Sequence, residues 1–148
     1  MPRPLDEGLR ATGARLLAAI VEVGAFGLAA AHIGEIAPVI ALNCTPDGPR
    51  RTDRLFYNPE VISAADKTAI GPEASVSMQG VQVDVERPVW IEIAYDDDLG
   101  IRQTVGFEDF LARCAIHEIE QTQGIFFLER ISRLKRDMAL KKHIKAQR

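Results

Sequence analysis

His117-Glu118-Ile119-Glu120-Gln121 is the stretch that says most about the fold of this chain, and it closes the most regular helical pattern in the sequence. His117 and Gln121 are four residues apart, so they lie on one face of a helix. The metal-binding motif His-Glu-x-x-His uses this spacing, but here a glutamine stands in the second histidine position. Without its surroundings, the segment predicts a helix with a core or surface histidine rather than a metal site.

The helix that carries this segment is predicted over 107–121. Glu108 and Asp109 fall in its first turn, where the helix dipole favours negative charge, and Gly124 ends it. Its predicted inward face consists of Phe110, Leu111, Cys114, Ala115 and positions 117, 118 and 121. A second helix is predicted over 5–23, because apolar residues recur there at three- and four-residue steps.

Apolar and polar residues alternate in the middle of the chain, which is typical of half-buried strands. Strands are predicted over 38–43, 55–57, 81–86, 89–93 and 101–105, with a hairpin turn over 96–100. A last helix begins at Ser132, which can cap it, and runs past Ile144 to the terminus. One α+β domain over 1–148 accounts for all these elements.

Composition is ordinary for a globular protein: 47% of the 148 residues are apolar and 26% are charged. No apolar run is long enough to cross a bilayer, and the first residues lack the layout of a secretory signal, so a cytoplasmic protein without a membrane partner is expected. Two cysteines are too few for a disulfide framework. Residues 129–148 carry eight Lys or Arg against two acidic residues, a basic tail on an acidic body that suggests an anionic partner.

Two further segments give the helix motif its context. They read Phe26-Gly-Leu-Ala-Ala-Ala-His32-Ile-Gly34 and Glu73-Ala-Ser75-Val-Ser77. Together with the segment at 117–121, and in the same order, they resemble the three signatures of the peptide deformylase family. The resemblance implies the fold of that family, with antiparallel and mixed β-sheets around the central His-Glu helix and a C-terminal helix.

The resemblance also implies which residues would hold a metal. In the family a cysteine and two histidines bind it, and here Ser75, His117 and Gln121 stand in those positions, so His117 alone is retained. Glu118 occupies the general acid/base position, and His32 replaces a loop glutamine that helps to stabilise the oxyanion. A serine hydroxyl cannot supply a thiolate charge, and an amide oxygen is a poor substitute for imidazole on a transition metal.

The family reaction removes the N-formyl group from the first methionine of nascent polypeptides by hydrolysis. With two ligands exchanged, this activity is expected to be weak or absent, and no cofactor is expected; an active form would use a divalent iron, zinc or nickel ion. One alternative is a metal-dependent hydrolase with a rebuilt site of His32, His117 and Glu118. Others are Ser75 as a nucleophile activated by a histidine, Cys114 as a substitute thiolate, or a protein that kept only the fold.

Partners follow from the same resemblance. The family binds the start of an extended peptide by strand addition and places the methionine side chain in an apolar pocket. The matching positions are Phe26, Gly27, Leu28, Val76, Phe110 and Cys114, although plain core packing explains these residues equally well. N-formylmethionyl peptides are therefore the expected ligands. Some family members dock at the ribosome through their C-terminal helix, so the basic tail at 129–148 predicts a similar contact.

Overall fold

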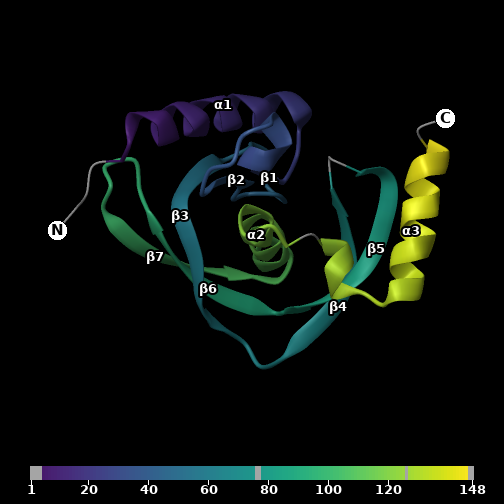
Figure 1. The fold of residues 1–148 in the computed structure, drawn as a ribbon. Helices are drawn as coiled ribbons and strands as arrows, with labels where there is room; N and C mark the ends of the chain where they lie inside the picture. Colours follow the sequence, from purple (N-terminus) through teal and green to yellow (C-terminus); the bar gives the residue numbers. More distant parts are fainter. Residues whose placement is uncertain (1–4, 76–77, 126, 147–148) are drawn as a thin grey trace.

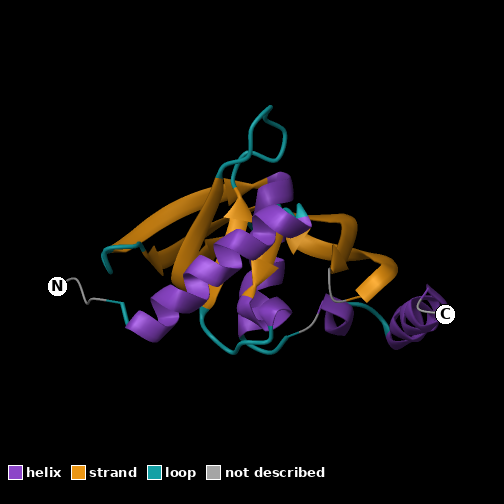
Figure 2. Cartoon of the chain, turned by 90° about the horizontal axis from the view of Figure 1, so that it is seen from above, coloured by secondary structure: helices purple, strands orange, loops and turns teal. Residues whose placement is uncertain are grey.

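The computed structural model describes residues 5–75, 78–125 and 127–146, and it places one helix, α2 (Asp109–Thr122), at the centre of the molecule (Figure 1). The other elements, in chain order, are α1 (Glu7–Val23), β1 (Gly27–Ala29), η1 (Ala30–Ile33), β2 (Val39–Asn43), β3 (Asp53–Ala64), β4 (Thr68–Ser75), β5 (Met78–Pro88), β6 (Trp90–Asp96), β7 (Arg102–Glu108), η2 (Phe127–Arg130) and α3 (Arg133–Ala146). The sheets wrap around α2, while α1 and α3 lie on the outside (Figures 1 and 2).

The strands form a five-stranded sheet in the order β1-β2-β3-β6-β7 and a two-stranded sheet of β4 and β5. Every pairing between described strands is antiparallel. Strands β1 and β4 are therefore edge strands, each paired on one side within its sheet. The predicted α+β fold with a central His-Glu helix and a C-terminal helix is confirmed.

Three groups of buried side chains hold the layers together. The largest lies between α2 and the five-stranded sheet, around Phe56 and Ile119. A second group fixes α1 against β1 and β2 through Leu16 and Ile20, which confirms the apolar face predicted for this helix. A smaller group, around Val85, holds α3 on β5. Burial of each large apolar side chain stabilises such contacts by about 1.5–3 kcal/mol.

Several predicted boundaries were wrong. The strand predicted over 55–57 extends over 53–64 as β3, because its pairing with β6 continues past a register shift between Tyr57 and Glu60. Asn58, in that shift, has a φ of 48°, a left-handed conformation that asparagine tolerates better than most residues. Strand β7 ends at Glu108, and α2 begins at Asp109 rather than at the predicted residue 107. Glu108 is therefore the N-cap of α2 and not part of its first turn.

The end of α1 follows its sequence closely. Gly24 adopts φ 71°, and its backbone N–H donates to the carbonyl of Ile20, which is the left-handed cap that glycine provides without strain. None of the helices within the described residues has the length and apolar character that a membrane span requires.

Candidate functional site

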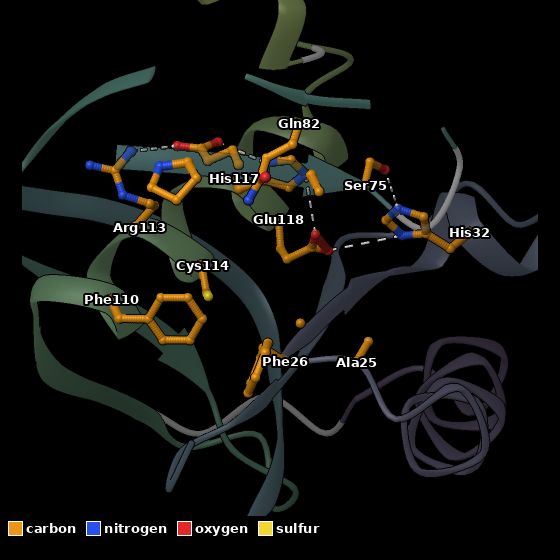
Figure 3. A pocket seen from close by; sticks show the side chains of 14 residues that line it. Ala25, Phe26, His32, Ser75, Gln82, Phe110, Arg113, Cys114, His117 and Glu118 are labelled. Carbon is orange, nitrogen blue, oxygen red and sulfur yellow. Dashed lines mark hydrogen bonds and ion pairs between the residues drawn. The ribbon is translucent and has the colours of Figure 1, made fainter. Parts of the chain in front are cut away.

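A cavity of about 420 Å³ opens between α2, the loop before β1, and strand β4. Its lining residues are Ala25, Phe26, Gly27, His32, Pro72, Glu73, Ala74, Ser75, Gln82, Phe110, Arg113, Cys114, His117 and Glu118. Polar groups gather on one side, around Glu118, and the two phenylalanines lie on the other (Figure 3). The three segments that the sequence singled out therefore meet at one place in the fold.

Glu118 lies at the centre of the polar side, between two imidazole rings (Figure 3). Its Oε1 is 3.6 Å from His117 Nε2, and its Oε2 is 3.9 Å from His32 Nδ1. Oε2 is the one buried side-chain atom among the described residues that lacks a hydrogen-bond partner. Burial raises the pKa of the Glu118 carboxyl to about 7, with the negative charge of Glu73 adding to the rise and His117 opposing it.

Gly27 explains how Glu118 reaches this position. A Cβ atom at residue 27 would lie 3.0 Å from Glu118 Cγ and 3.1 Å from a methyl group of Leu42. Such contacts are tighter than packed side chains normally make. The glycine in β1 thus lets the edge strand lie directly against the acid.

His117 is held in place by Glu73, which lies 44 residues earlier in the chain, on β4. The His117 Nδ1–H donates to Glu73 Oε1 at 2.9 Å, and the Gln121 side-chain amide lies 3.3 Å from the other ring nitrogen, Nε2. The nitrogen that would face a metal in the family arrangement thus contacts an amide from the next helical turn. Glu73 orients the imidazole in the way that carboxylates orient metal-ligating histidines.

Glu73 is itself part of a buried ionic network. Arg87 donates to both of its carboxylate oxygens, from Nε at 2.8 Å and Nη2 at 2.9 Å, and Arg113 donates to Oε2 at 2.9 Å. Arg87 also pairs with Glu120, which in turn pairs with Arg130. Burial alone would raise the pKa of the Glu73 carboxyl, but the hydrogen bonds from Arg87 and His117 outweigh it and hold that pKa at about 2.

His32 lies in η1 and is anchored by the backbone of Ala29, the last residue of β1. Its Nδ1 lies 2.9 Å from the amide nitrogen of Ala29 and 3.1 Å from the carbonyl oxygen of the same residue. Burial lowers the pKa of the His32 imidazole, and the nearby His117 lowers it further. Its Nε2 is 3.5 Å from Ser75 Oγ, which is longer than the 2.6–3.2 Å expected between a nucleophile and its base.

The donors present do not fit the metal that the family resemblance implies. A catalytic transition-metal site takes three side chains, drawn mainly from imidazole, thiolate and carboxylate groups, around an open position. Within the described residues no three such side chains are arranged to hold an ion. Of the three family positions, Ser75 and Gln121 offer a neutral hydroxyl and an amide, and the Gln121 amide contacts the one remaining imidazole.

Cys114 lies one helical turn before His117 and lines the cavity. Burial raises the pKa of its thiol to about 12, and the carboxylates of Glu118 and Glu73 add to this effect. At neutral pH the sulfur is a thiol, a small apolar group rather than an anionic ligand.

The structure brings together most of the predicted ligand-binding residues. Phe26, Gly27, Phe110 and Cys114 line the cavity, and the two phenylalanine rings meet edge to face with their centroids 5.0 Å apart. Leu28 does not belong to this set: its side chain is fully buried among residues that pack under α1, because neighbouring residues of a strand point to opposite faces. Val76 and Ser77 lie outside the described residues.

Three lining residues were missed by reasoning from the sequence: Pro72, Gln82 and Arg113. Arg113 donates to the carbonyl oxygens of Gly71 and Val85, and so ties α2 to β4 and β5. Its position, four residues before His117, was the available signal, since such residues share a helix face. Gln82 is a polar residue of the alternating pattern over 81–86, and it is exposed and lines the cavity.

Comparisons with known proteins agree on one family. The family model described as polypeptide deformylase matches residues 3–137. A peptide deformylase-like protein of Agrobacterium fabrum is 40% identical over 96% of this chain and 84% of its own length, and a peptide deformylase of Rhizobium meliloti is 32% identical over 96% and 82%. The crystal structure of a peptide deformylase from Legionella pneumophila superposes with a TM-score of 0.85 at 26% identity, covering 99% of this chain and 86% of that one. The chain therefore belongs to the polypeptide deformylase family of hydrolases.

Proposed function

We propose that this protein binds the first residues of a polypeptide in the cavity beside Glu118, and that it removes a formyl group slowly or not at all. One observation carries the proposal: an apolar cavity is present beside Glu118, while Ser75 and Gln121 stand at two of the three positions that bind the metal in the family. Peptide binding depends on the residues that line the cavity, whereas the family reaction depends on the side chains that bind the metal.

The sheet edges beside the cavity suit an extended peptide. Gly27 lies on edge strand β1, and Ala74 lies on edge strand β4, and both line the cavity. An edge strand offers unpaired backbone N–H and C=O groups, to which a peptide can add as a further strand. The paired rings of Phe26 and Phe110, each half-exposed, supply an apolar surface for its first side chain.

The expected loss of rate follows from the chemistry of water. A bound catalytic metal lowers the pKa of water from 15.7 to about 7 and polarises the carbonyl that is attacked. General acid/base help by a positioned carboxylate contributes about 10²–10⁴-fold. Glu118 can move a proton, and His32 can hydrogen-bond to a carbonyl oxygen, but neither residue generates a nucleophile at neutral pH.

The alternative is a hydrolase whose metal site is rebuilt from His32, His117 and Glu118. The position of the Glu118 carboxylate between the two rings favours it, at 3.9 and 3.6 Å. The anchoring of His32 Nδ1 by the Ala29 backbone opposes it, because the ring would have to turn or present only Nε2, which faces Ser75.

Calorimetric titration with methionyl tripeptides, both formylated and unformylated, tests the binding. We expect measurable binding by the native protein and at least a tenfold loss in a Phe110→Ala variant, which removes half of the aromatic pair. A Leu134→Ala variant, on the exposed outer side of α3, should bind like the native protein. Absence of binding by any of these peptides would contradict the proposal.

Formate release separates the proposal from its alternative. The protein is purified without oxygen, supplied with iron, nickel, cobalt or zinc, and given a formyl-methionyl tripeptide. We expect no more formate than a Glu118→Ala variant releases. Metal-dependent release above that control would favour the rebuilt site, and its loss in a His32→Ala variant would identify the new ligand.

We further propose that α3 contacts the ribosome, which places the protein in the cytoplasm. The helix lies at the outer edge of the molecule, with Lys135, Lys141, Lys142 and Lys145 exposed (Figure 1). Such side chains bind phosphates, with an affinity that falls as salt rises. Changing Lys141, Lys142 and Lys145 to glutamate should abolish cosedimentation with ribosomes while leaving peptide binding intact. Unchanged cosedimentation would rule out this contact.

A further inference from the structure

One oxygen of the Glu118 carboxylate, Oε2, accepts no hydrogen bond from the described residues. This oxygen is buried, although the Glu118 side chain lines an open cavity. A buried charged oxygen without a donor is strongly unfavourable, and native structures almost always satisfy such atoms. An atom of this kind, pointing into a cavity, indicates the chemistry of the ligand that belongs there.

The two neighbouring histidine side chains do not donate a hydrogen bond to this oxygen. His32 Nδ1 is 3.9 Å from this oxygen, beyond hydrogen-bond distance, and it contacts the Ala29 backbone at 2.9 Å. The His117 ring donates from Nδ1 to Glu73. Both rings are thus oriented by other partners, so a ligand in the cavity can supply the donor for Glu118.

We infer that the cavity is built for a primary ammonium group, namely the unformylated amino terminus of a polypeptide with an apolar first residue. The inference rests on the peptide-binding function proposed above and names the chemical form of the peptide. An ammonium group carries three N–H donors and a positive charge, so it can satisfy Glu118 Oε2 and keep a donor for Ser75 Oγ. The apolar side chain then lies against Phe26 and Phe110.

A formylated terminus fits the same place less well. Its amide nitrogen is neutral and has one N–H, and its carbonyl oxygen brings a second acceptor beside the carboxylate. In the family arrangement a metal receives that oxygen, but no three suitable side chains of the described residues are arranged to hold an ion. A formyl group therefore leaves a buried acceptor poorly matched, which is the situation in which binding sites discriminate most strongly between ligands.

Competition among three peptides tests the inference. Met-Ala-Ser with a free amino terminus, formyl-Met-Ala-Ser and acetyl-Met-Ala-Ser differ only in the group that would face Glu118. We expect the free peptide to bind at least tenfold more tightly than either blocked peptide in calorimetric titrations at pH 7. Equal or tighter binding of the formyl peptide would overturn the inference and leave the proposed function standing. Failure of all three to bind would overturn both.

The variant Glu118→Gln shows whether the carboxylate is responsible. It keeps the shape of the side chain and removes its charge, so the free peptide should lose at least tenfold in affinity while the formyl peptide changes less than twofold. Glu22→Gln, the same exchange on the exposed face of α1, should change neither affinity. If the Glu118→Gln variant still preferred the free peptide, another group would bind the ammonium, and the inference would be contradicted.

Discussion

An Arg87→Ala variant should lose about 3–5 kcal/mol of unfolding free energy, the amount typical for breaking a buried ion pair on one side. Arg87 is 4% exposed and donates to both carboxylate oxygens of Glu73, at 2.8 and 2.9 Å, and also to Glu120. Removing it takes away the positive charge that joins the buried carboxylates of Glu73 and Glu120, and leaves Arg113 and Arg130 as their remaining ionic partners. Urea unfolding at pH 7, followed by circular dichroism, measures the loss.

Arg102→Ala is the matched control for this experiment. Arg102 also pairs with two carboxylates, Glu60 and Asp96, but its side chain is 42% exposed. Ion pairs in contact with water contribute about 0–1 kcal/mol, so this variant should remain close to the native protein. Equal losses in the two variants would show that the network around Arg87 does not stabilise the fold as its burial indicates.

A Glu118→Gln variant should be more stable than the native protein by about 3 kcal/mol at pH 8. The pKa of Glu118 is about 7 in the fold, against an ordinary value of 4.5, so folding disfavours its ionised form. Each unit of such a difference corresponds to about 1.4 kcal/mol. The folded state binds the extra proton between these two pKa values, so the destabilisation by Glu118 grows as pH rises from about 4.5 and is complete above 7.

The pH dependence makes this prediction specific. Thermal unfolding of Glu118→Gln and of the native protein should show a difference that is full at pH 8 and nearly gone at pH 4. Glu22→Gln, which changes an exposed carboxylate, should unfold like the native protein at both pH 8 and pH 4. A constant difference across this range would mean that the ionisation of Glu118 is not its source.

A stabilising substitution at position 118 has a functional meaning. Binding sites commonly keep groups that weaken the fold, because the same groups are satisfied when the ligand arrives. The ammonium that we infer would supply the partner that Glu118 Oε2 lacks. Peptide binding and the stability of Glu118→Gln are thus two measurements of one buried carboxylate.

The main elements were predictable because each depends on local pattern. Helices α1 and α2 have apolar residues at helical spacing, and β5 alternates apolar and polar side chains. The length of β3 and the existence of β4 as a separate strand were not predictable in this way. The length of β3 depends on its pairing with β6, which lies beyond β4 and β5 in the chain, and β4 depends on its pairing with the next strand, β5. Pairing partners override local preference.

The candidate site likewise contains residues that the sequence predicted and residues that only the fold revealed. Its residues in the three segments, among them His32, Glu73 and Glu118, were recognised from spacing and from the resemblance to the family. Leu28 was misplaced because the direction of a side chain within a short strand depends on register. Arg113 was missed because its role comes from contacts with β4 and β5, about 40 and 28 residues away in the chain.

The sequence by itself indicated the family and the main helices and strands, and the resemblance placed Ser75 and Gln121 at two positions that bind the metal in the family. These are properties of residue type and spacing, which folding does not change. Only the tertiary structure decided that Glu118 keeps an oxygen without a hydrogen-bond partner among the described residues, and that Arg87 joins Glu73 to Glu120. Charges and hydrogen bonds act over a few ångströms, so their partners exist only once packing brings distant segments together.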